Sequence, residues 1–293
     1  MGADAFRQVE NVMTKRREVL NRIKTFGEIS SIMSALKNIS TMETRKLARF
    51  LLSQQQVVAN IAAVAADFLH FYPLYAASAP SSLHVCLLIG SERGFCGDFN
   101  TTVLQAFGKR RQGGPEKIIT VGRKLASEVS GVYPDMISFE GPSVADEVHG
   151  ILGALANALN DLRLERGVYA LTLWHHDEKA PGGVREIPVL PPFSSVYGQE
   201  TARAYPPRLN LSPDRFFAEL VNHYIFSLLH TAFFASLMTE HAQRIRHLEG
   251  AIRRIDEQSA ALKQKSNLLR QEEITEEIEE IMLGTYLDEP SGL

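Results

Sequence analysis

Residues 245–262 have the sequence IRHLEGAIRRIDEQSAAL and lie near the C-terminus of a chain of 293 residues. Apolar side chains recur there in alternating steps of three and four positions, with Ser259 filling one slot. They are Ile245, Leu248, Ile252, Ile255 and Leu262. A repeat averaging about 3.5 residues is typical of a helix that packs along another helix. This stretch therefore predicts a coiled coil.

The pattern slips near Arg270 and then resumes in the isoleucines Ile274, Ile278 and Ile281, which predicts a local change of winding. A similar apolar stripe occurs near the N-terminus. It consists of Val19, Ile23, Phe26, Ile29, Ile32, Leu36 and Ile39. Because the segment between the two stripes returns the chain, the simplest arrangement is an antiparallel pair of terminal helices.

The positions of the prolines divide the chain into three parts. There is no proline before Pro73 and none between Pro213 and Pro290. Proline breaks helices, so both terminal segments are free to be helical. We expect an N-terminal coiled-coil helix over 1–72, a separate domain over 80–207 and a C-terminal coiled-coil helix over 212–287.

The middle segment alternates between two kinds of pattern. Short apolar runs at 84–89, 118–121 and 168–174 suit buried strands. Helical candidates lie between them at 101–107, 123–129 and 143–164, and the Pro- and Gly-rich residues 181–192 suit a loop or an edge hairpin. Alternation of this kind predicts an α/β domain with a mostly parallel sheet.

Composition excludes several classes of function. The formal net charge of −3 gives no basic surface for nucleic acid, and two cysteines do not make a disulfide framework. The apolar stretches 57–66 and 225–238 are too short or too polar for membrane spans and are interpreted as buried helix. No secretory signal is visible at the N-terminus. Any association with a membrane is therefore expected to occur through a partner.

A glycine loop at residues 90–97, GSERGFCG, follows the first expected strand and precedes a helix. Phosphate-binding loops occupy that position, but the spacing fits neither common nucleotide motif, and no lysine follows. We interpret it as a tight turn and expect no cofactor. Cys96 lies near Arg93 and is open to two interpretations, a reactive thiol or a small residue packed in the turn, of which the second is favoured.

His175, His176, Asp177 and Glu178 resemble a metal cluster, but adjacent residues on a strand point to opposite faces. We therefore expect a solvated strand end and no metal. Charge is distributed unevenly as well: basic residues outnumber acidic ones nine to three over 15–49, and six glutamates lie within 272–280. Two interpretations stay open, solvated helix faces with weak ion pairs or a charged surface presented to a surrounding protein.

Several segments resemble the gamma subunit of F-type ATP synthases, and the resemblance covers nearly the whole chain. Residues 23–36, IKTFGEISSIMSAL, align without gaps with the first long helix of that family. Residues 91–100, SERGFCGDFN, resemble its S-D-R-G-L-C-G-G-L-N segment, and residues 238–244 resemble its S-E-x-A-A-R-M region. Residues 270–278, RQEEITEEI, are similar to its R-Q-A-x-I-T-x-E-I signature.

The resemblance implies a long antiparallel coiled coil of the terminal helices plus a Rossmann-like α/β foot domain. It also implies a central rotor shaft without a catalytic site, which couples ion flow through a membrane ring to ATP synthesis or hydrolysis. The implied partners are the alpha and beta subunits, the epsilon subunit and the c-ring. The implied location is the cytoplasmic face of a bacterial inner membrane, as a peripheral subunit.

The resemblance also implies roles for particular residues. Contacts with the beta subunits would be made by Arg244, Arg270, Gln271, Thr275 and Glu277, and an apolar tip would be formed by Ile281, Met282 and Leu283. The foot-domain turn would contain Arg93, Gly94, Cys96 and Gly97.

Asp98 stands where the family has a glycine, which questions the form of that turn. Arg244 flanks the apolar seam, so we expect an exposed side chain that acts in coupling and not in folding. Two alternatives remain, a structural coiled-coil adaptor with an α/β domain and a free α/β enzyme. The coupling ion is not readable from this chain.

Overall fold

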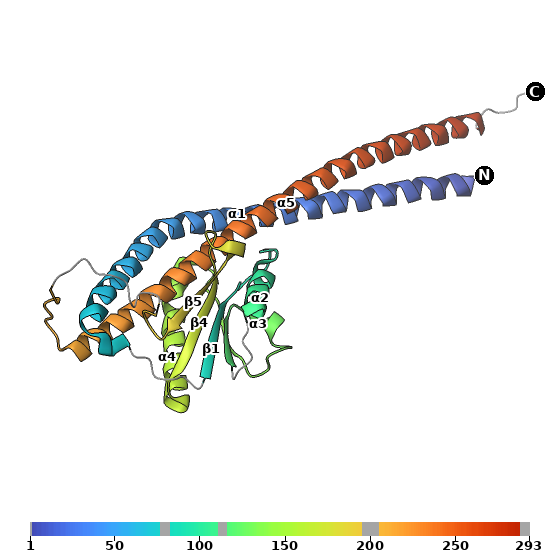
Figure 1. The fold of residues 1–293 in the computed structure, drawn as a ribbon. Helices are drawn as coiled ribbons and strands as arrows, with labels where there is room; N and C mark the ends of the chain where they lie inside the picture. The colour runs from blue at the N-terminus through green and yellow to red at the C-terminus, as the bar shows by residue number, and fades with distance from the viewer. Residues whose placement is uncertain (1, 77–82, 111–115, 195–204, 288–293) are drawn as a thin grey trace, which may run out of the picture. The chain divides into compact units, whose positions relative to one another are not determined.

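The computed structural model describes residues 2–76, 83–110, 116–194 and 205–287. Along the chain, one very long helix precedes a segment of alternating strands and helices, and another follows it (Figure 1). In chain order the elements are α1 (Gly2–Phe71), η1 (Pro73–Ala76), β1 (Leu83–Ile89), α2 (Phe99–Arg110), β2 (Glu116–Val121), α3 (Arg123–Val129), β3 (Ile137–Phe139), η2 (Ala145–Glu147), α4 (Val148–Arg166), β4 (Tyr169–His176), η3 (Pro181–Gly183), β5 (Val184–Leu190) and α5 (Pro213–Leu287).

The three expected strands and three expected helices of the middle segment are confirmed as β1, β2, β4, α2, α3 and α4. The Pro- and Gly-rich segment forms a hairpin, in which β5 pairs antiparallel to β4. Sequence patterns missed β3, which has only three residues and pairs in parallel with β2. A strand this short is too brief to show a periodic pattern.

The chain divides into two compact units, each of which contains part of both long helices. The first unit contains residues 1–38 and 248–293, and the second contains residues 39–247. The second unit therefore includes the whole sheet together with the adjoining parts of α1 and α5.

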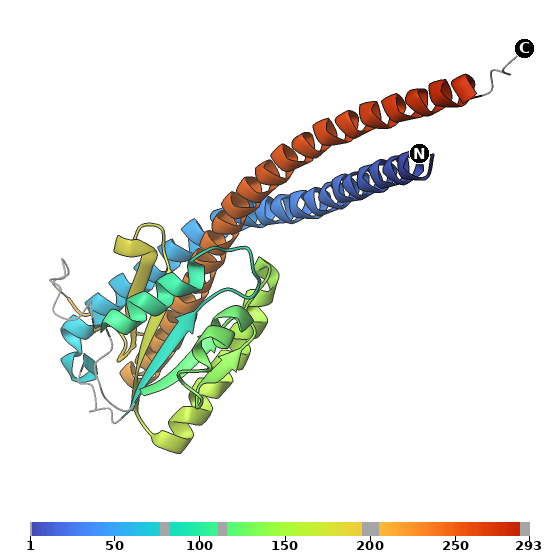
Figure 2. The ribbon, with the colours of Figure 1, turned by 90° about the vertical axis from the view of Figure 1, so that its right-hand side faces the viewer.

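In the first unit the two helices pair antiparallel, side by side, with both chain ends at the same end (Figure 1 and Figure 2). Val19 and Leu269 are buried against each other in a small apolar cluster that also contains Ile23 and Leu262. The Arg16 guanidinium donates to the Glu273 carboxylate at 2.6 Å on one side of this cluster. The antiparallel pairing expected from the two apolar stripes is thus confirmed.

On α1 the seam follows a different set of residues from the expected stripe after Phe26. Ile29 and Ile32 are exposed, and the less exposed positions are Ser30 and Met33. The reason is geometric: steps of three from Phe26 to Ile29 and Ile32 drift around the helix, whereas contact with a partner requires alternating steps of three and four. Three consecutive short steps therefore turn the isoleucines to the outside.

On α5 the predicted slip near Arg270 is wrong, although the seam up to Leu262 is as expected. The alternating steps continue without interruption through Ser266, Leu269 and Glu273, all of which are buried. The isoleucines that would have resumed the seam are exposed instead. They are Ile274, Ile278 and Ile281, with exposed fractions of 46%, 51% and 69%. The seam thus continues in polar as well as apolar residues.

The second unit is built on a five-stranded sheet in the order β3-β2-β1-β4-β5. All neighbouring strands are parallel except the β4–β5 pair. The chain moves from β1 outward to β3 and then crosses back to β4 on the other side of β1. This is the doubly wound arrangement, and it places the switch in strand order between β1 and β4.

The two faces of the sheet pack against different helices, as the alternation of side chains along β1 shows. Cys86 and Leu88 face a cluster formed with α2 and α3. Val85 and Leu87 face a larger cluster formed with α4 and with buried residues of α1 and α5. Figure 1 shows α4 on the opposite side of the sheet from α2 and α3.

The apolar residues 225–238 of α5 belong to this larger core, where Phe233 is completely buried. By length and composition α5 contains one window that could cross a membrane, but 56% of that window is buried inside the protein. Burial against the sheet explains the apolar composition of this window, as expected for a core helix.

Candidate functional site

The glycine loop is held tightly to the carboxyl end of β1. At Gly90 a Cβ atom would lie 2.4 Å from the Cβ of Leu125, so only glycine allows α3 to approach so closely. The Ser91 amide donates to the Asn100 side chain at 2.9 Å, and Asn100 in turn donates to Glu128 at 3.2 Å. The loop is therefore fixed at its base by α2 and α3.

Glu92 fixes the loop to two neighbouring turns. Its buried carboxylate accepts the backbone amides of Arg123 at 3.0 Å and Gly141 at 2.7 Å, and it also accepts from the Arg123 guanidinium. Burial alone would raise its pKa, but these donors outweigh burial and hold the pKa of Glu92 below its ordinary value. Glu92 thus remains a charged structural anchor.

The crevice at the switch point, where doubly wound domains bind nucleotides, is filled by protein side chains. The ring of Phe99, at the start of α2, stacks on His176, at the end of β4, with centroids 3.7 Å apart. The imidazole Nε2 of His176 lies 2.8 Å from the Phe99 carbonyl oxygen. The interpretation of the loop as a turn rather than a phosphate site fits this packing.

The predicted solvated end at His175 and His176 is wrong, because both side chains are buried, with exposed fractions of 3% and 1%. Burial lowers the pKa of His175 to about 4 and also lowers the pKa of His176. Each neutral ring forms a hydrogen bond with a backbone carbonyl oxygen, which replaces a hydrogen bond to water that is lost on burial. Among the residues that the structure describes, no group of three or more His, Cys, Asp or Glu side chains could hold a metal ion.

The top of the glycine loop contacts α5 through a buried polar group that we call the Arg244 cluster. It consists of Arg244, Glu240 and His241 from α5 with Gly94 and Cys96 from the loop. The Arg244 guanidinium donates to the Gly94 carbonyl oxygen at 3.3 Å, to the Cys96 sulfur at 3.1 Å and to the Glu240 carboxylate. It also lies 3.1 Å from Nδ1 of His241.

The electrostatics of the Arg244 cluster follow from its burial. Removal from water raises the pKa of Glu240 to about 7, although the Arg244 charge opposes the rise. Burial and the neighbouring Glu240 raise the pKa of the Cys96 thiol to about 12, and burial followed by the Arg244 charge lowers the pKa of His241 to about 4. Cys96 is therefore a packed thiol and not a nucleophile.

This cluster contradicts our expectation that Arg244 is exposed on the helix surface. Only 6% of Arg244 is exposed, and its partners belong to its own chain. Arg244 precedes Ile245 of the expected seam, but it is covered by the glycine loop, which is distant in sequence. A contact between segments so far apart leaves no local signal in the sequence.

The turn itself contains two residues with positive φ, Phe95 and Gly97. At Gly97 φ is +62°, and this backbone conformation is what favours glycine, because the nearest atoms that a Cβ would meet belong to the end of the exposed His247 side chain. Asp98 lies just before α2 and is not one of the positive-φ residues, which explains why a side chain is tolerated where the family has glycine. Arg93 donates to the Ser143 hydroxyl at 3.0 Å.

The other residues expected at partner contacts lie in the first unit, whereas Arg244 lies in the second. Arg270, Gln271, Thr275 and Glu277 are exposed on α5. Ile281 and Met282 are exposed as well, with exposed fractions of 69% and 54%, whereas the side chain of Leu283 falls outside the described residues.

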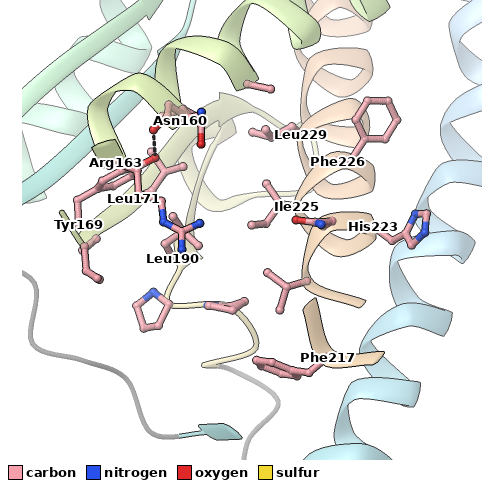
Figure 3. Close-up of a pocket in the computed structure, with 18 of the residues that line it drawn as sticks. Asn160, Arg163, Tyr169, Leu171, Leu190, Phe217, His223, Ile225, Phe226 and Leu229 are labelled. Atoms are coloured by element: carbon pink, nitrogen blue, oxygen red, sulfur yellow. Dashed lines mark hydrogen bonds between the residues drawn. The ribbon is translucent and has the colours of Figure 1, made fainter. Parts of the chain in front are cut away.

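A groove of about 1010 Å³ lies in the second unit between α4, β4 and α5 (Figure 3). Its walls are mostly apolar, with Leu171, Ile225 and Leu229 among them. In Figure 3 Asn160 and Arg163 lie close together on α4, whereas the ring of His223 lies on the side of α5 away from Leu171. The titratable side chains of the groove therefore do not gather at one point, and its mostly apolar surface is suited to packing.

Comparison with known proteins supports one family. The family model described as ATP synthase matches residues 15–286. The ATP synthase gamma chain of Pelotomaculum thermopropionicum is 24% identical over 294 residues, which cover 93% of this chain and 98% of the relative. That of Saccharopolyspora erythraea is 27% identical over 303 residues, covering 93% and 97%.

Solved structures have the same fold. A chain in the OSCP/F1/c-ring structure of the Euglena gracilis mitochondrial ATP synthase, in rotational state 3, matches with a TM-score of 0.64 and 16% identity. The match covers 96% of this chain and 97% of that chain. A chain of the rotor of the same enzyme, in rotational state 1, matches with a TM-score of 0.59 and 14% identity, covering 89% and 99%. The chain described above belongs to the ATP synthase family, as a gamma chain, the non-catalytic subunit of the central stalk in an F-type ATP synthase.

Proposed function

We propose that the first unit acts as the shaft of a rotor, with the outer face of α5 in contact with the alpha and beta subunits. The observation that carries this proposal is the row of exposed apolar residues at its end: Ile274, Ile278, Ile281 and Met282. Ile274, Ile278 and Ile281 follow one another in steps of four and three, Met282 lies four positions after Ile278, and all four lie on one side of the helix, away from the seam. A contiguous exposed apolar surface of this kind is typical of a protein interface.

Polar residues on the same stretch of α5 would make this interface sensitive to the orientation of the shaft. Arg270, Gln271, Thr275 and Glu277 are exposed beside the isoleucines. The Thr275 hydroxyl donates to the Gln271 carbonyl oxygen at 2.9 Å, but the other groups are available for hydrogen bonds to a neighbour. Charged hydrogen bonds depend on angle and distance, so they would favour particular orientations of the shaft.

The coupling mechanism requires an asymmetric shaft. Ile274 and Ile278 are exposed on α5, whereas Ile29 and Ile32 are exposed at other positions on α1. Three identical sites around such a shaft would each meet a different surface at any one angle. Differential contact shifts the conformational equilibrium of each site, and rotation would move that preference from one site to the next.

The sequence left two interpretations of the basic residues on α1, and each applies to a different set of them. Arg16 pairs with Glu273, and Lys37 lies 3.7 Å from Glu249, so part of the charge stabilises the helix pair itself. Arg17 and Arg22 are exposed. We assign these to the surface that faces the surrounding subunits.

The second unit would be the foot of the rotor and would bind the c-ring and the epsilon subunit. Its exposed surface differs from that of the shaft in being built on a sheet and several short helices. Association with the membrane would then be peripheral and indirect, at the cytoplasmic face in a bacterium. The gamma relatives of bacterial origin support this placement.

The proposal is tested by isolating the chain from cells through an affinity tag. We expect alpha, beta and epsilon subunits and the c-ring to be recovered together with it, and the recovered complex to pump ions when it hydrolyses ATP. Recovery of a chain without alpha and beta subunits would contradict the proposal and favour the structural adaptor.

A further inference from the structure

We propose that Arg244 and Glu240 are positioning residues that fasten the glycine loop to α5, so that torque passes between the sheet and the helix at this point. The inference rests on the proposed rotor function but assigns these residues a role within the chain instead of a contact with another subunit. It concerns only the second unit, which contains every residue of the Arg244 cluster.

The guanidinium of Arg244 joins the two elements directly. Two of its contacts, to the Gly94 carbonyl oxygen at 3.3 Å and the Cys96 sulfur at 3.1 Å, are with the loop. The others, to Glu240 and His241, are with its own helix. Because the planar group has several donors in a fixed geometry, it holds the loop and the helix in one orientation.

The loop side of the contact is equally constrained. Gly97 has a positive φ of 62°, which a residue with a Cβ would adopt only under strain, and the base of the loop is held to the sheet through Ser91 and Asn100. A displacement of α5 relative to the loop would therefore have to break hydrogen bonds at one end or the other. A rigid connection of this kind transmits force without a change of shape.

The place of the cluster along α5 supports the same role. The buried apolar residues that α5 contributes to the large core of the second unit lie between Tyr224 and Leu237. The Arg244 cluster follows at once, and the second unit ends at His247. Apolar packing is non-directional and tolerates sliding, whereas hydrogen bonds to a buried guanidinium do not. The cluster thus supplies directional contacts at the last part of α5 within this unit.

The two cysteines of the chain allow the contact to be monitored in the assembled complex. Cys96 belongs to the cluster, whereas Cys86 is buried in β1, and both are thiols outside disulfides. Labelling of each thiol by a maleimide, followed by mass spectrometry of this subunit, distinguishes opening of the loop from unfolding of the sheet. Arg246→Ala is the matched control, because Arg246 is exposed on the same turn of α5.

We expect Arg244→Ala to speed labelling of Cys96 by about tenfold or more, since it removes several charge-assisted bonds that oppose local opening. Cys86 should stay protected. In the same complexes fewer ions should be pumped per ATP hydrolysed, while hydrolysis continues. Gly97→Ala should also speed labelling of Cys96 and reduce pumping, because it alters the loop side of the contact. Arg244→Lys should show both effects more weakly than Arg244→Ala. Arg246→Ala should show neither effect.

Two results would overturn the inference. If Arg244→Ala reduced pumping while Cys96 stayed protected from labelling, Arg244 would act on a partner subunit. If Arg244→Ala sped labelling of Cys86 and Cys96 equally, Arg244 would only support the core. Failure of the proposed function would differ from both, because the complex with the unaltered chain would then not pump ions, whatever the labelling of Cys96.

Discussion

Arg244 illustrates how the role of a single side chain follows from its burial. On an exposed helix surface the loss of an arginine usually costs less than about 0.5 kcal/mol. Here the guanidinium is buried beside an equally buried carboxylate, Glu240. Removing one partner leaves the other charge in a poorly solvating environment, which is the costly case.

We therefore expect Arg244→Ala to reduce the free energy of unfolding by about 3 kcal/mol, the range for breaking a buried ion pair. Urea denaturation of the purified chain measures this, with Arg246→Ala as the control at an exposed position of the same helix. Equal stability of the two variants would show that Arg244 is solvated in the isolated chain.

Buried histidines also make the stability of the protein sensitive to acid. The pKa values of His175 and His241 are lowered to about 4, and that of His176 is lowered as well. The unfolded chain takes up protons on these residues below about pH 6.5, whereas the folded chain does so only at lower pH, nearer 4 for His175 and His241. Their contribution to stability is therefore present above pH 6.5 and is lost as the pH falls toward 4.

Glu240 has the opposite effect, because its pKa is raised to about 7. Its contribution is present below its unfolded pKa of about 4.5 and is lost as the pH rises through 7. Burial lowers the pKa of His230 as well, so among the described residues four histidines oppose Glu240 between pH 4.5 and 6.5. We therefore expect the free energy of unfolding to fall with acidification. Urea denaturation at several pH values should show a smaller slope for His241→Gln than for the unaltered chain, and an equal slope would contradict the expectation.

At the scale of elements, the helix pair of the first unit is only partly apolar along its seam. Ser30, Ser266 and Glu273 occupy inward positions beside Val19 and Leu269. Polar residues at such positions reduce the stability of a coiled coil and specify its register. The pair is thus suited to a shaft that is supported by surrounding subunits.

The outer apolar row on α5 predicts a separation of assembly from folding. Ile278→Asp places a charge in this row, where burial against a partner would be costly, and should reduce assembly with alpha and beta subunits or ion pumping per ATP. Since Ile278 is half exposed in the chain itself, the melting temperature of the isolated subunit should hardly change. Leu52→Asp adds the same charge at an exposed leucine of α1 in the second unit and is the control. A large fall in melting temperature would show that Ile278 belongs to the seam.

At the scale of the whole molecule, the sheet and the helix segments around it share one core. That core joins β1, β2 and β4 to α4 and to residues of both long helices within 39–247. The α/β domain is therefore not independent of α1 and α5, since Phe68 and Phe233 are both fully buried in the same cluster.

Truncation after Ile274 removes only residues of the first unit. We expect the shortened chain to keep the cooperative unfolding transition of the second unit, with assembly or coupling impaired. Thermal unfolding followed by circular dichroism, together with ATP-driven pumping, measures the two effects. Loss of the transition would mean that the end of α5 contributes to the core around the sheet.

The purified chain by itself should not hydrolyse ATP. The switch-point crevice is filled by Phe99 and His176, and the Cys96 thiol is held protonated. A phosphate-release assay on the isolated chain tests this expectation, with the assembled complex as the positive control. Turnover that persists through further purification would contradict it.

The sequence by itself determined the elements and their order. Proline-free segments indicated the two long helices, alternating steps of three and four indicated their pairing, and apolar runs indicated β1, β2 and β4. These features are local, because propensity, proline placement and periodicity depend on residues only a few positions apart. The family resemblance was equally accessible, since it rests on short contiguous segments such as residues 270–278.

Only the tertiary structure decided which side chains are covered. Ile29 and Ile274 face outward because the phase of the seam is set by the partner helix, and His175 is buried on β4, which pairs with a strand on each side. Arg244 became internal through a contact with a loop almost 150 positions earlier in the chain. Burial is a property of segments brought together by folding, so local patterns could place these residues on an element but could not say what covers them.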